Sequence, residues 1–148
     1  MAPDPGAVKR AQRFAQRLGT PVAFVDKRRT SSSGMEVTAT TVVGDVSGRR
    51  AILFDEEVDR GSSLLEATDL LLRHGASEVY AACTHAVLSG PAVERLSASP
   101  IRQLVVTDTV PVPVHKRWDG LTVLSIAPLL AECMRRIHTG RSVSTLFA

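Results

Sequence analysis

The sequence predicts an α/β protein with three layers: a mostly parallel sheet with helices on both faces. Short apolar runs typical of buried strands alternate along the chain with segments of helical periodicity. Polar turns follow several of these runs directly, as they do where strands feed helices. Hydrophobic residues make up 44% of the chain and aromatic residues only 4%, so we expect a core of Val, Leu, Ala and Ile.

The length and composition favour one domain, residues 1–148, of 148 residues in all. A formal charge of +3 is too small to indicate a nucleic-acid partner. No apolar run is long enough to span a membrane, and the amino terminus lacks the apolar core of a signal peptide. Cys83 and Cys133 lie in apolar contexts without CxxC spacing. We therefore expect a cytoplasmic protein with reduced cysteines.

The amino-terminal part predicts a helix, a strand and a basic segment. Apolar residues recur with helical spacing over 7–18, and a short apolar strand follows at 21–26. Lys27, Arg28 and Arg29 come next, ahead of a polar, flexible stretch at 30–34. The basic trio is either a solvated strand end, which we favour from the residues alone, or a lid that brings positive charge onto phosphates.

The remaining elements alternate between strands and helices. We expect strands at 37–43, 50–54, 78–84, 103–106 and 121–126, and helices at 64–74, 92–96 and 127–138. The strands at 37–43 and 50–54 could form a hairpin across the turn GDVSG. The strand at 78–84 is apolar enough to be buried on both faces.

The stretch between the strand at 50–54 and the helix after it carries the chemistry. Asp55, Glu56 and Asp59 precede a turn that holds Gly61, Ser62 and Ser63. A helix amino terminus offers unpaired N–H groups to an anion, and carboxylates accept hydrogen bonds from sugar hydroxyls. The loop is either a ribose-phosphate site or an acidic loop with a serine cap on a helix, and its residues alone leave the two alternatives level.

Several longer motifs resemble one family in order along the chain. They are PDPGAVKRAQRFA, DKRR, VVGDVSGR, ILFDEEVDRGSS, THAVLSGPAVERL, VVTDTVP and LAECMRRIHTGRSVSTLF. Together they resemble the carboxyl-terminal half of ribose-phosphate diphosphokinase (PRPP synthetase). The resemblance implies a phosphoribosyltransferase-like fold, and it implies that the family's amino-terminal half is absent from these 148 residues.

The resemblance also implies roles for individual residues. Asp55 and Glu56 would face the ribose hydroxyls, and residues 59–63, which include Arg60, would hold the 5-phosphate. Lys27 and Arg29 would be catalytic and stabilise charge on the transferring phosphates. Asp4 would be a ligand of Mg²⁺, and Ser142, Val143 and Ser144 resemble a regulatory phosphate segment.

The implied reaction is the transfer of diphosphate from ATP to ribose 5-phosphate, which makes PRPP for nucleotide biosynthesis. The anomeric hydroxyl attacks the β-phosphorus of Mg-ATP, and AMP leaves. The implied partners are ribose 5-phosphate or PRPP, Mg-ATP, and other subunits, either in a homo-oligomer or in a hetero-oligomer with a full-length synthetase.

Three positions in the loop depart from the family's usual pattern. Glu56 stands where an Asp is usual, Arg60 stands in place of Thr, and Ser62 in place of Gly. Because Ser62 restricts backbone angles that Gly allows, we expect weaker binding of sugar phosphate. Arg60 could instead bind the phosphate directly.

Two other functions fit the residues. One is a non-catalytic regulatory or assembly subunit of a PRPP synthetase, which the half-length chain and the altered loop favour. The other is a PRPP-using phosphoribosyltransferase, which the synthetase-like segment THAVLSGPA and the carboxyl-terminal segment disfavour.

Overall fold

The computed structural model describes residue 1, residues 8–32 and residues 35–147, with the side chains of residues 27–40 excepted. The helices are α1 (Val8–Leu18), α2 (Ser62–Arg73), α3 (Ala92–Ser97) and α4 (Ala127–His138). The strands are β1 (Phe24–Ser32), β2 (Met35–Val43), β3 (Arg50–Val58), β4 (Glu78–Ala86), β5 (Ile101–Thr107) and β6 (Leu121–Leu124). Two 3₁₀ turns lie at Val114–Lys116 and Ser144–Leu146. Among the described residues, no helix is long and apolar enough to cross a bilayer.

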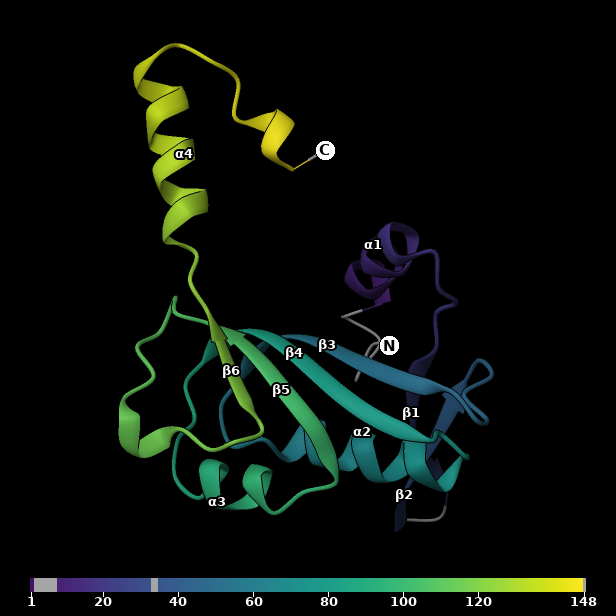
Figure 1. Ribbon diagram of the computed structural model, residues 1–148. Helices are drawn as coiled ribbons and strands as arrows, with labels where there is room; N and C mark the ends of the chain where they lie inside the picture. Colours follow the sequence, from purple (N-terminus) through teal and green to yellow (C-terminus); the bar gives the residue numbers. More distant parts are fainter. Residues whose placement is uncertain (2–7, 33–34, 148) are drawn as a thin grey trace.

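A parallel four-stranded sheet of order β3-β4-β5-β6 forms the centre of the molecule (Figure 1). The order of the strands in the sheet is their order in the sequence, so each strand pairs with the free edge of the preceding one. Right-handed crossovers then place the connecting helices on one face of the sheet, and α2 and α3 do lie together there. Helix α1 lies over the opposite face. The predicted α/β class is confirmed.

The core lies between the sheet and the α2–α3 layer. Leu53, Val79 and Leu104 point into it from β3, β4 and β5, and Leu64 and Leu71 meet them from α2. Burial alternates along these strands, as the two-residue period of a strand requires. We call the α2–α3 side the closed face and the α1 side the open face.

The open face is only partly covered. Tyr80 and Ala82 of β4 are half-buried, while Val79 and Ala81 beside them are buried on the closed face. The expectation that this strand is buried on both faces is therefore wrong. Its apolar composition is typical of a strand that is packed on both faces, but among the described residues only the closed face is fully covered.

Strands β1 and β2 form a separate antiparallel hairpin, with Phe24 opposite Val43. The backbone of the basic trio, residues 27–29, therefore lies within β1 and not at the root of a long loop. Strand β2 pairs with β1, and β3 pairs with β4, so the hairpin expected between β2 and β3 does not form.

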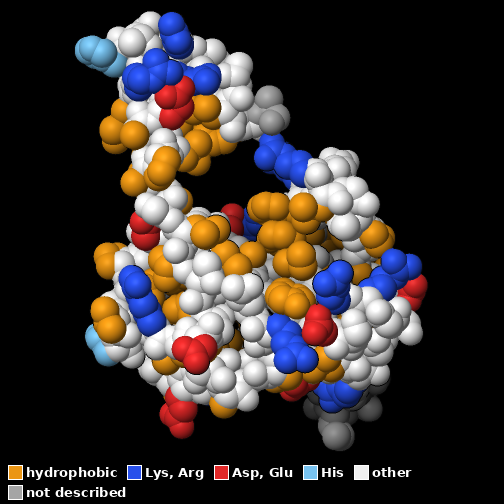
Figure 2. All heavy atoms as spheres, viewed as in Figure 1, with side chains coloured by type: hydrophobic (Ala, Val, Ile, Leu, Met, Phe, Trp, Pro, Cys, Tyr) orange, Lys and Arg blue, Asp and Glu red, His pale blue; other side chains and the backbone are white. Residues whose placement is uncertain are grey.

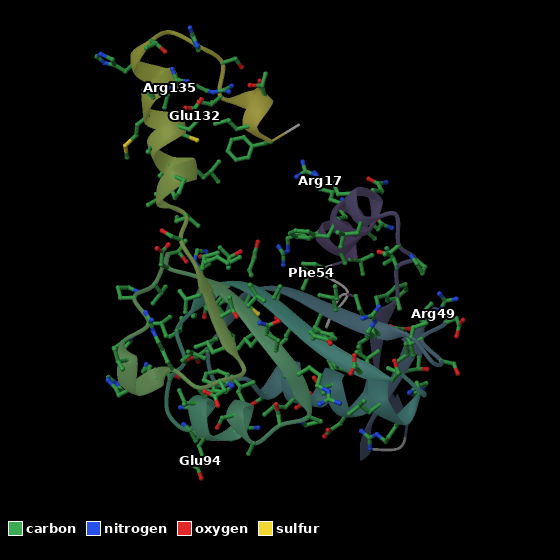
Figure 3. All side chains as sticks on the ribbon, viewed as in Figure 1. Arg17, Arg49, Phe54, Glu94, Glu132 and Arg135 are labelled. Carbon is green, nitrogen blue, oxygen red and sulfur yellow. The ribbon has the colours of Figure 1, made fainter. Side chains whose placement is uncertain are left out.

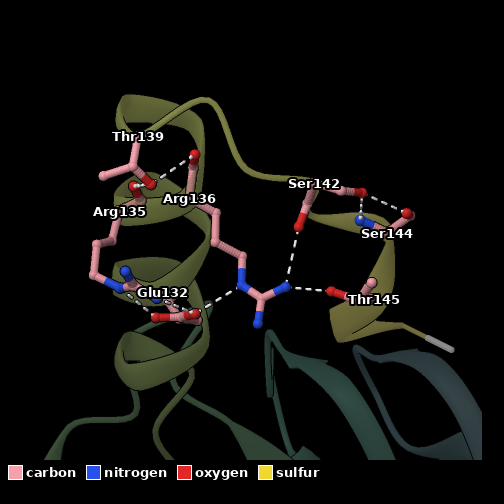
Figure 4. Close-up of polar contacts among 7 residues, drawn as sticks. All are labelled: Glu132, Arg135, Arg136, Thr139, Ser142, Ser144 and Thr145. Carbon is pink, nitrogen blue, oxygen red and sulfur yellow. Dashed lines mark hydrogen bonds and ion pairs between the residues drawn. The ribbon is translucent and has the colours of Figure 1, made fainter.

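Helix α4 projects away from the sheet (Figure 1). Glu132 accepts hydrogen bonds from Arg135 and Arg136 on the same helix. Arg136 also donates to the carbonyl oxygen of Ser142 at 3.0 Å and to Thr145, which ties the carboxyl-terminal segment to the helix (Figure 4). That segment reaches back to α1, where Nη2 of Arg17 donates to the carbonyl oxygen of Phe147 at 2.8 Å.

Candidate sugar-phosphate site

The candidate site lies where β3 ends and α2 begins. Strand β3 ends at Val58, residues 59–61 form a tight turn, and α2 starts at Ser62. Within the described residues, the backbone N–H groups of residues 60–64 donate to no protein acceptor, and the first helical bond runs from Leu65 to Gly61 at 3.0 Å. Unpaired N–H groups at a helix amino terminus favour an anion.

A cavity of about 270 Å³ opens beside these N–H groups. Its lining consists of two carboxylates of β3 and the whole turn: Asp55, Glu57, Val58, Asp59, Arg60, Gly61, Ser62, Ser63 and Leu64. A lining that combines carboxylates with backbone N–H donors is suited to a hydroxylated phosphate ester. The structure thus brings together Asp55 and residues 59–63 of the predicted site.

Glu56 does not line this cavity. Successive residues of a strand point to opposite faces, so Glu56 turns to the open face while Asp55 and Glu57 turn to the cavity. There Oε1 of Glu56 accepts a hydrogen bond from Nη1 of Arg10 on α1 at 2.5 Å. The backbone N–H of Glu56 donates to Oδ1 of Asp55 at 2.8 Å. Glu57 is therefore a cavity residue that our reading of the sequence missed, although strand alternation could have found it.

Hydrogen bonds from the next strand–helix unit, β4–α3, hold this turn in place. The Ser89 hydroxyl donates to Oδ1 of Asp59, and the Ser89 N–H donates to the Asp59 carbonyl at 3.1 Å. Nη1 of Arg95 on α3 donates to the carbonyl of Arg60 at 3.3 Å and to Oγ of Ser62 at 3.1 Å. No local pattern in the sequence pairs residues that lie 30 or more positions apart, as Ser89 and Asp59 do.

Gly61 supplies the unusual conformation of the turn. Its φ is 74°, a left-handed value that glycine adopts without a steric penalty. A Cβ atom here would also lie 3.0 Å from Cγ of Leu96. Ser62, in contrast, lies in α2, and Leu88 alone among the described non-glycine residues has a positive φ. Ser62 therefore does not need the backbone freedom of glycine, because the position with a left-handed backbone is residue 61. The weaker binding of sugar phosphate expected from the sequence stays a prediction.

The neighbouring strand ends hold polar groups in structural roles. Nδ1 of His85 lies 2.9 Å from Oγ1 of Thr109. Oδ1 of Asp108 accepts from the N–H of Ile126 at 2.8 Å, just ahead of α4. Hydrogen bonds from the hydroxyl of Ser125 and from that N–H lower the pKa of Asp108.

Burial, with a further contribution from the charge of Asp55, raises the pKa of Cys83 to about 12.

Three predicted residues cannot be placed in this site. Asp4 and the side chains of Lys27 and Arg29 lie outside the described part of the chain. Within the described part, no three His, Cys, Asp or Glu side chains are grouped to hold a metal ion.

The chain matches one family model, that of the phosphoribosyl synthetase-associated domain, over residues 30–148. The match covers 119 of the 148 residues (148 − 30 + 1). The chain belongs to this family. The resemblance to PRPP synthetases is thereby confirmed.

Curated relatives of this synthetase family agree. The chain is 50% identical over 147 residues to a ribose-phosphate pyrophosphokinase of Caldanaerobacter subterraneus subsp. tengcongensis. This match covers 99% of this chain and 46% of the relative. It is 45% identical over 148 residues to the ribose-phosphate pyrophosphokinase of Bacillus subtilis, covering 100% of this chain and 46% of the relative.

A solved structure agrees as well. The phosphoribosylpyrophosphate synthetase of Mycobacterium smegmatis superposes with a TM-score of 0.85 at 42% identity, over 94% of this chain and 44% of that one. The chain spans about half the length of the curated relatives it matches.

Proposed function

We propose that this chain is the ribose 5-phosphate-binding half of a ribose-phosphate diphosphokinase. One observation carries the proposal: an acid-lined cavity of about 270 Å³ faces the unpaired N–H groups at the start of α2. A ribose phosphate carries the two features that such a cavity recognises, vicinal hydroxyls and a dianion. Membership of the synthetase family supports this choice over other anions.

In this proposal the N–H groups of residues 60–64 hold the 5-phosphate, and the positive end of the α2 dipole adds to the attraction. Asp55 accepts hydrogen bonds from the ribose hydroxyls, and Glu57 stands beside it in the cavity. Glu56 acts through its backbone, because its N–H fixes Oδ1 of Asp55 while its carboxylate is engaged by Arg10. Arg60 also lines the cavity and supplies a positive side chain near the phosphate.

The reaction proposed is attack of the anomeric hydroxyl on the β-phosphorus of ATP. A new bond forms between that oxygen and the β-phosphorus, and the hydroxyl proton passes to water. The bond from the β-phosphorus to the oxygen that bridges it to the α-phosphate breaks, and AMP leaves with that oxygen and the bonding electron pair. Lys27 and Arg29 would stabilise charge on the transferring phosphates. Positioning of the two substrates accounts for most of the catalysis in such transfers.

Mg²⁺ would enter with ATP and neutralise phosphate charge. The donor chemistry fits a hard cation, since carboxylate oxygens of Asp55 and Asp59 line the cavity and Mg²⁺ prefers oxygen ligands. Asp4 remains the proposed protein ligand.

A second function is a non-catalytic regulatory or assembly subunit that binds an active synthetase. It is supported by the place of Glu56, which does not line the cavity and whose carboxylate accepts a hydrogen bond from Arg10. In both versions the protein is proposed to be cytoplasmic and to work in an oligomer, either with its own copies or with full-length synthetase.

Titration calorimetry with ribose 5-phosphate tests the site. We expect saturable binding to the chain and a loss of about 10-fold or more for Asp55→Asn, because a charged acceptor is removed. Glu94→Gln is the matched control, since Glu94 points into solvent from α3, away from the cavity (Figure 3). Absence of binding, or equal losses for the two variants, would remove the proposal.

Product analysis separates the alternatives. Release of AMP from ATP in the presence of ribose 5-phosphate supports a synthetase. Binding of ribose 5-phosphate without AMP release, together with co-purification of a full-length synthetase, supports the regulatory subunit. PRPP-dependent consumption of a nucleobase would instead indicate a phosphoribosyltransferase.

A further inference from the structure

His85 stands near the end of β4, beside the sugar-phosphate cavity. It pairs in register with Glu57 of β3, and Glu57 lines the cavity. Paired residues of neighbouring strands point to the same face of a sheet, and the strands lie about 4.8 Å apart. The exposed ring of His85 is therefore next to the cavity without forming part of its wall.

A group of threonine hydroxyls orients the ring. Nδ1 of His85 lies 2.9 Å from Oγ1 of Thr109. The Thr109 hydroxyl donates to the carbonyl oxygen of Thr84 at 3.0 Å, and the Thr107 hydroxyl donates to the same oxygen at 2.7 Å. A hydroxyl has one hydrogen to donate. Because the hydrogen of Thr109 is directed to the carbonyl, its lone pairs face His85, and Nδ1 is the donor of that hydrogen bond.

This hydrogen bond leaves the other ring nitrogen as an acceptor. In a neutral imidazole one nitrogen carries the proton and the other a lone pair, so a proton on Nδ1 places the lone pair on Nε2. Within the described part of the chain, Nε2 of His85 makes no hydrogen bond. The end of β4 thus offers a free acceptor of fixed direction beside the carboxylates of Asp55 and Glu57.

The proposed orientation of the sugar brings a donor to this acceptor. With the 5-phosphate at the N–H groups of residues 60–64 and the ring hydroxyls at Asp55, the anomeric carbon lies across the ring from the carbon that carries the phosphate arm. Strand β3 is at the edge of the four-stranded sheet that the described residues form, so the strand end beside it is that of β4. A hydroxyl on the anomeric carbon is a donor that a lone pair on Nε2 can accept.

We propose that Nε2 of His85 accepts a hydrogen bond from the anomeric hydroxyl of ribose 5-phosphate and so orients the attacking oxygen. The proposal rests on the proposed function and adds a substrate-binding residue from outside the β3–α2 turn. Thr109 is the positioning residue, because it keeps the lone pair on Nε2. The contact holds the sugar before the reaction begins, and it selects a sugar whose anomeric hydroxyl is free.

Calorimetry tests the contact with two ligands, ribose 5-phosphate and its 1-deoxy analogue, which lacks only the anomeric hydroxyl. We expect the parent chain to prefer ribose 5-phosphate by about 5-fold, as for the loss of one hydrogen bond. His85→Leu should bind both ligands equally, with the affinity that the parent has for the analogue. His85→Gln keeps an acceptor and should retain part of the preference.

His138→Ala is the matched histidine control. Residue 138 is exposed at the end of α4, where Figure 2 shows basic and His side chains on the surface. This variant should keep the full preference for ribose 5-phosphate.

Nitrogen NMR of the His85 ring supplies a readout that needs no catalysis. We expect a protonated Nδ1 and an unprotonated Nε2 in the free chain. Ribose 5-phosphate should shift the Nε2 resonance more than the 1-deoxy analogue does. Thr109→Val removes the acceptor of the Nδ1 proton at nearly constant volume, so it should admit the Nε2–H form and reduce the preference. Thr122→Val on β6, where Thr122 accepts from Gln103, should change neither.

The outcomes separate this proposal from the function. A preference for ribose 5-phosphate that survives in His85→Leu, or a ring protonated on Nε2 alone in the free chain, would overturn the His85 contact and leave the sugar-phosphate site standing. Failure of the parent chain to bind either ligand would remove the proposed function and this contact with it. If His85→Leu does not fold, His85→Gln and the spectra of the parent chain decide.

Discussion

Arg95 reaches from α3 to Oγ of Ser62, with Nη1 and Oγ 3.1 Å apart, and binds the carbonyl of Arg60 with the same nitrogen. The serine that stands in place of the family's usual glycine is therefore a hydrogen-bond partner that helps to fix the turn. We infer that Ser62 helps to order the turn between β3 and α2.

Arg95→Ala should weaken binding of ribose 5-phosphate by about 5- to 30-fold, equivalent to about 1–2 kcal/mol, because both bonds to the turn are lost. Ser62→Gly should also weaken it, by less. Calorimetry checks both variants, with Arg73→Ala at the exposed end of α2 as the matched arginine control. Tighter binding by Ser62→Gly would contradict the inference.

Gly61→Ala should destabilise the protein by about 2–3 kcal/mol. About 1 kcal/mol comes from the left-handed backbone, and the rest from crowding against Leu96. Gly90 also has a positive φ, but a Cβ atom added there would meet no heavy atom within 4 Å, so Gly90→Ala should cost only the backbone contribution, about 1 kcal/mol. Urea unfolding of the two variants measures the difference; equal losses would show that Leu96 moves aside freely.

The link between α4 and the carboxyl-terminal segment should weaken in acid. Hydrogen bonds from Arg135, and then from Arg136, lower the pKa of Glu132 from 4.5 to about 2. A carboxyl with a lowered pKa stabilises the folded state fully above its unfolded value and loses that contribution as pH falls through its folded value. The protection factors of the amides in α4, which are corrected for the pH dependence of intrinsic exchange, should therefore fall between pH 4.5 and about 2.

Glu132→Gln provides the control for this acid effect. The variant lacks the titrating group, so the protection factors of α4 should be lower at neutral pH and change little further in that range. Unchanged protection factors in the parent protein down to pH 2 would argue against the link.

The two cysteines should react very differently with thiol reagents. Cys83 is buried and its pKa is about 12, so at pH 8 its thiolate fraction is only about 10⁻⁴. Cys133 is half-exposed on α4. A disulfide reagent at pH 8 should label one thiol quickly and the second only on unfolding, and Cys133→Ser should remove the fast phase. A fast phase that persists in Cys133→Ser would show that Cys83 is accessible.

The sequence predicted those features that local patterns determine. Alternating apolar residues, the glycine turn and the helical stripe after it were enough to locate the β3–α2 unit and its acidic loop. The end of β3 was predicted too early, at residue 54, because acidic residues resemble a loop. Pairing of Glu57 with His85 on β4 extends the strand, and this extension sends Glu56 to the opposite face.

Other parts of the site could not be read from the sequence. Arg95 and Ser89 meet the turn across 30 or more residues, and only the folded sheet places α3 beside α2. The loose packing of α4 was equally hidden, since an amphipathic helix has the same pattern whether its partner is in the same chain or elsewhere.

The strand order β3-β4-β5-β6 also bears on how the molecule is assembled during synthesis. Contacts on the closed face join neighbouring strand–helix units, so each forms by closing a short loop at a small entropic cost. We expect this side to fold as soon as its units leave the ribosome. On the open face, Phe14 of α1 meets Phe54 of β3 with the whole β1–β2 hairpin between them in the sequence, so we expect this contact to form later.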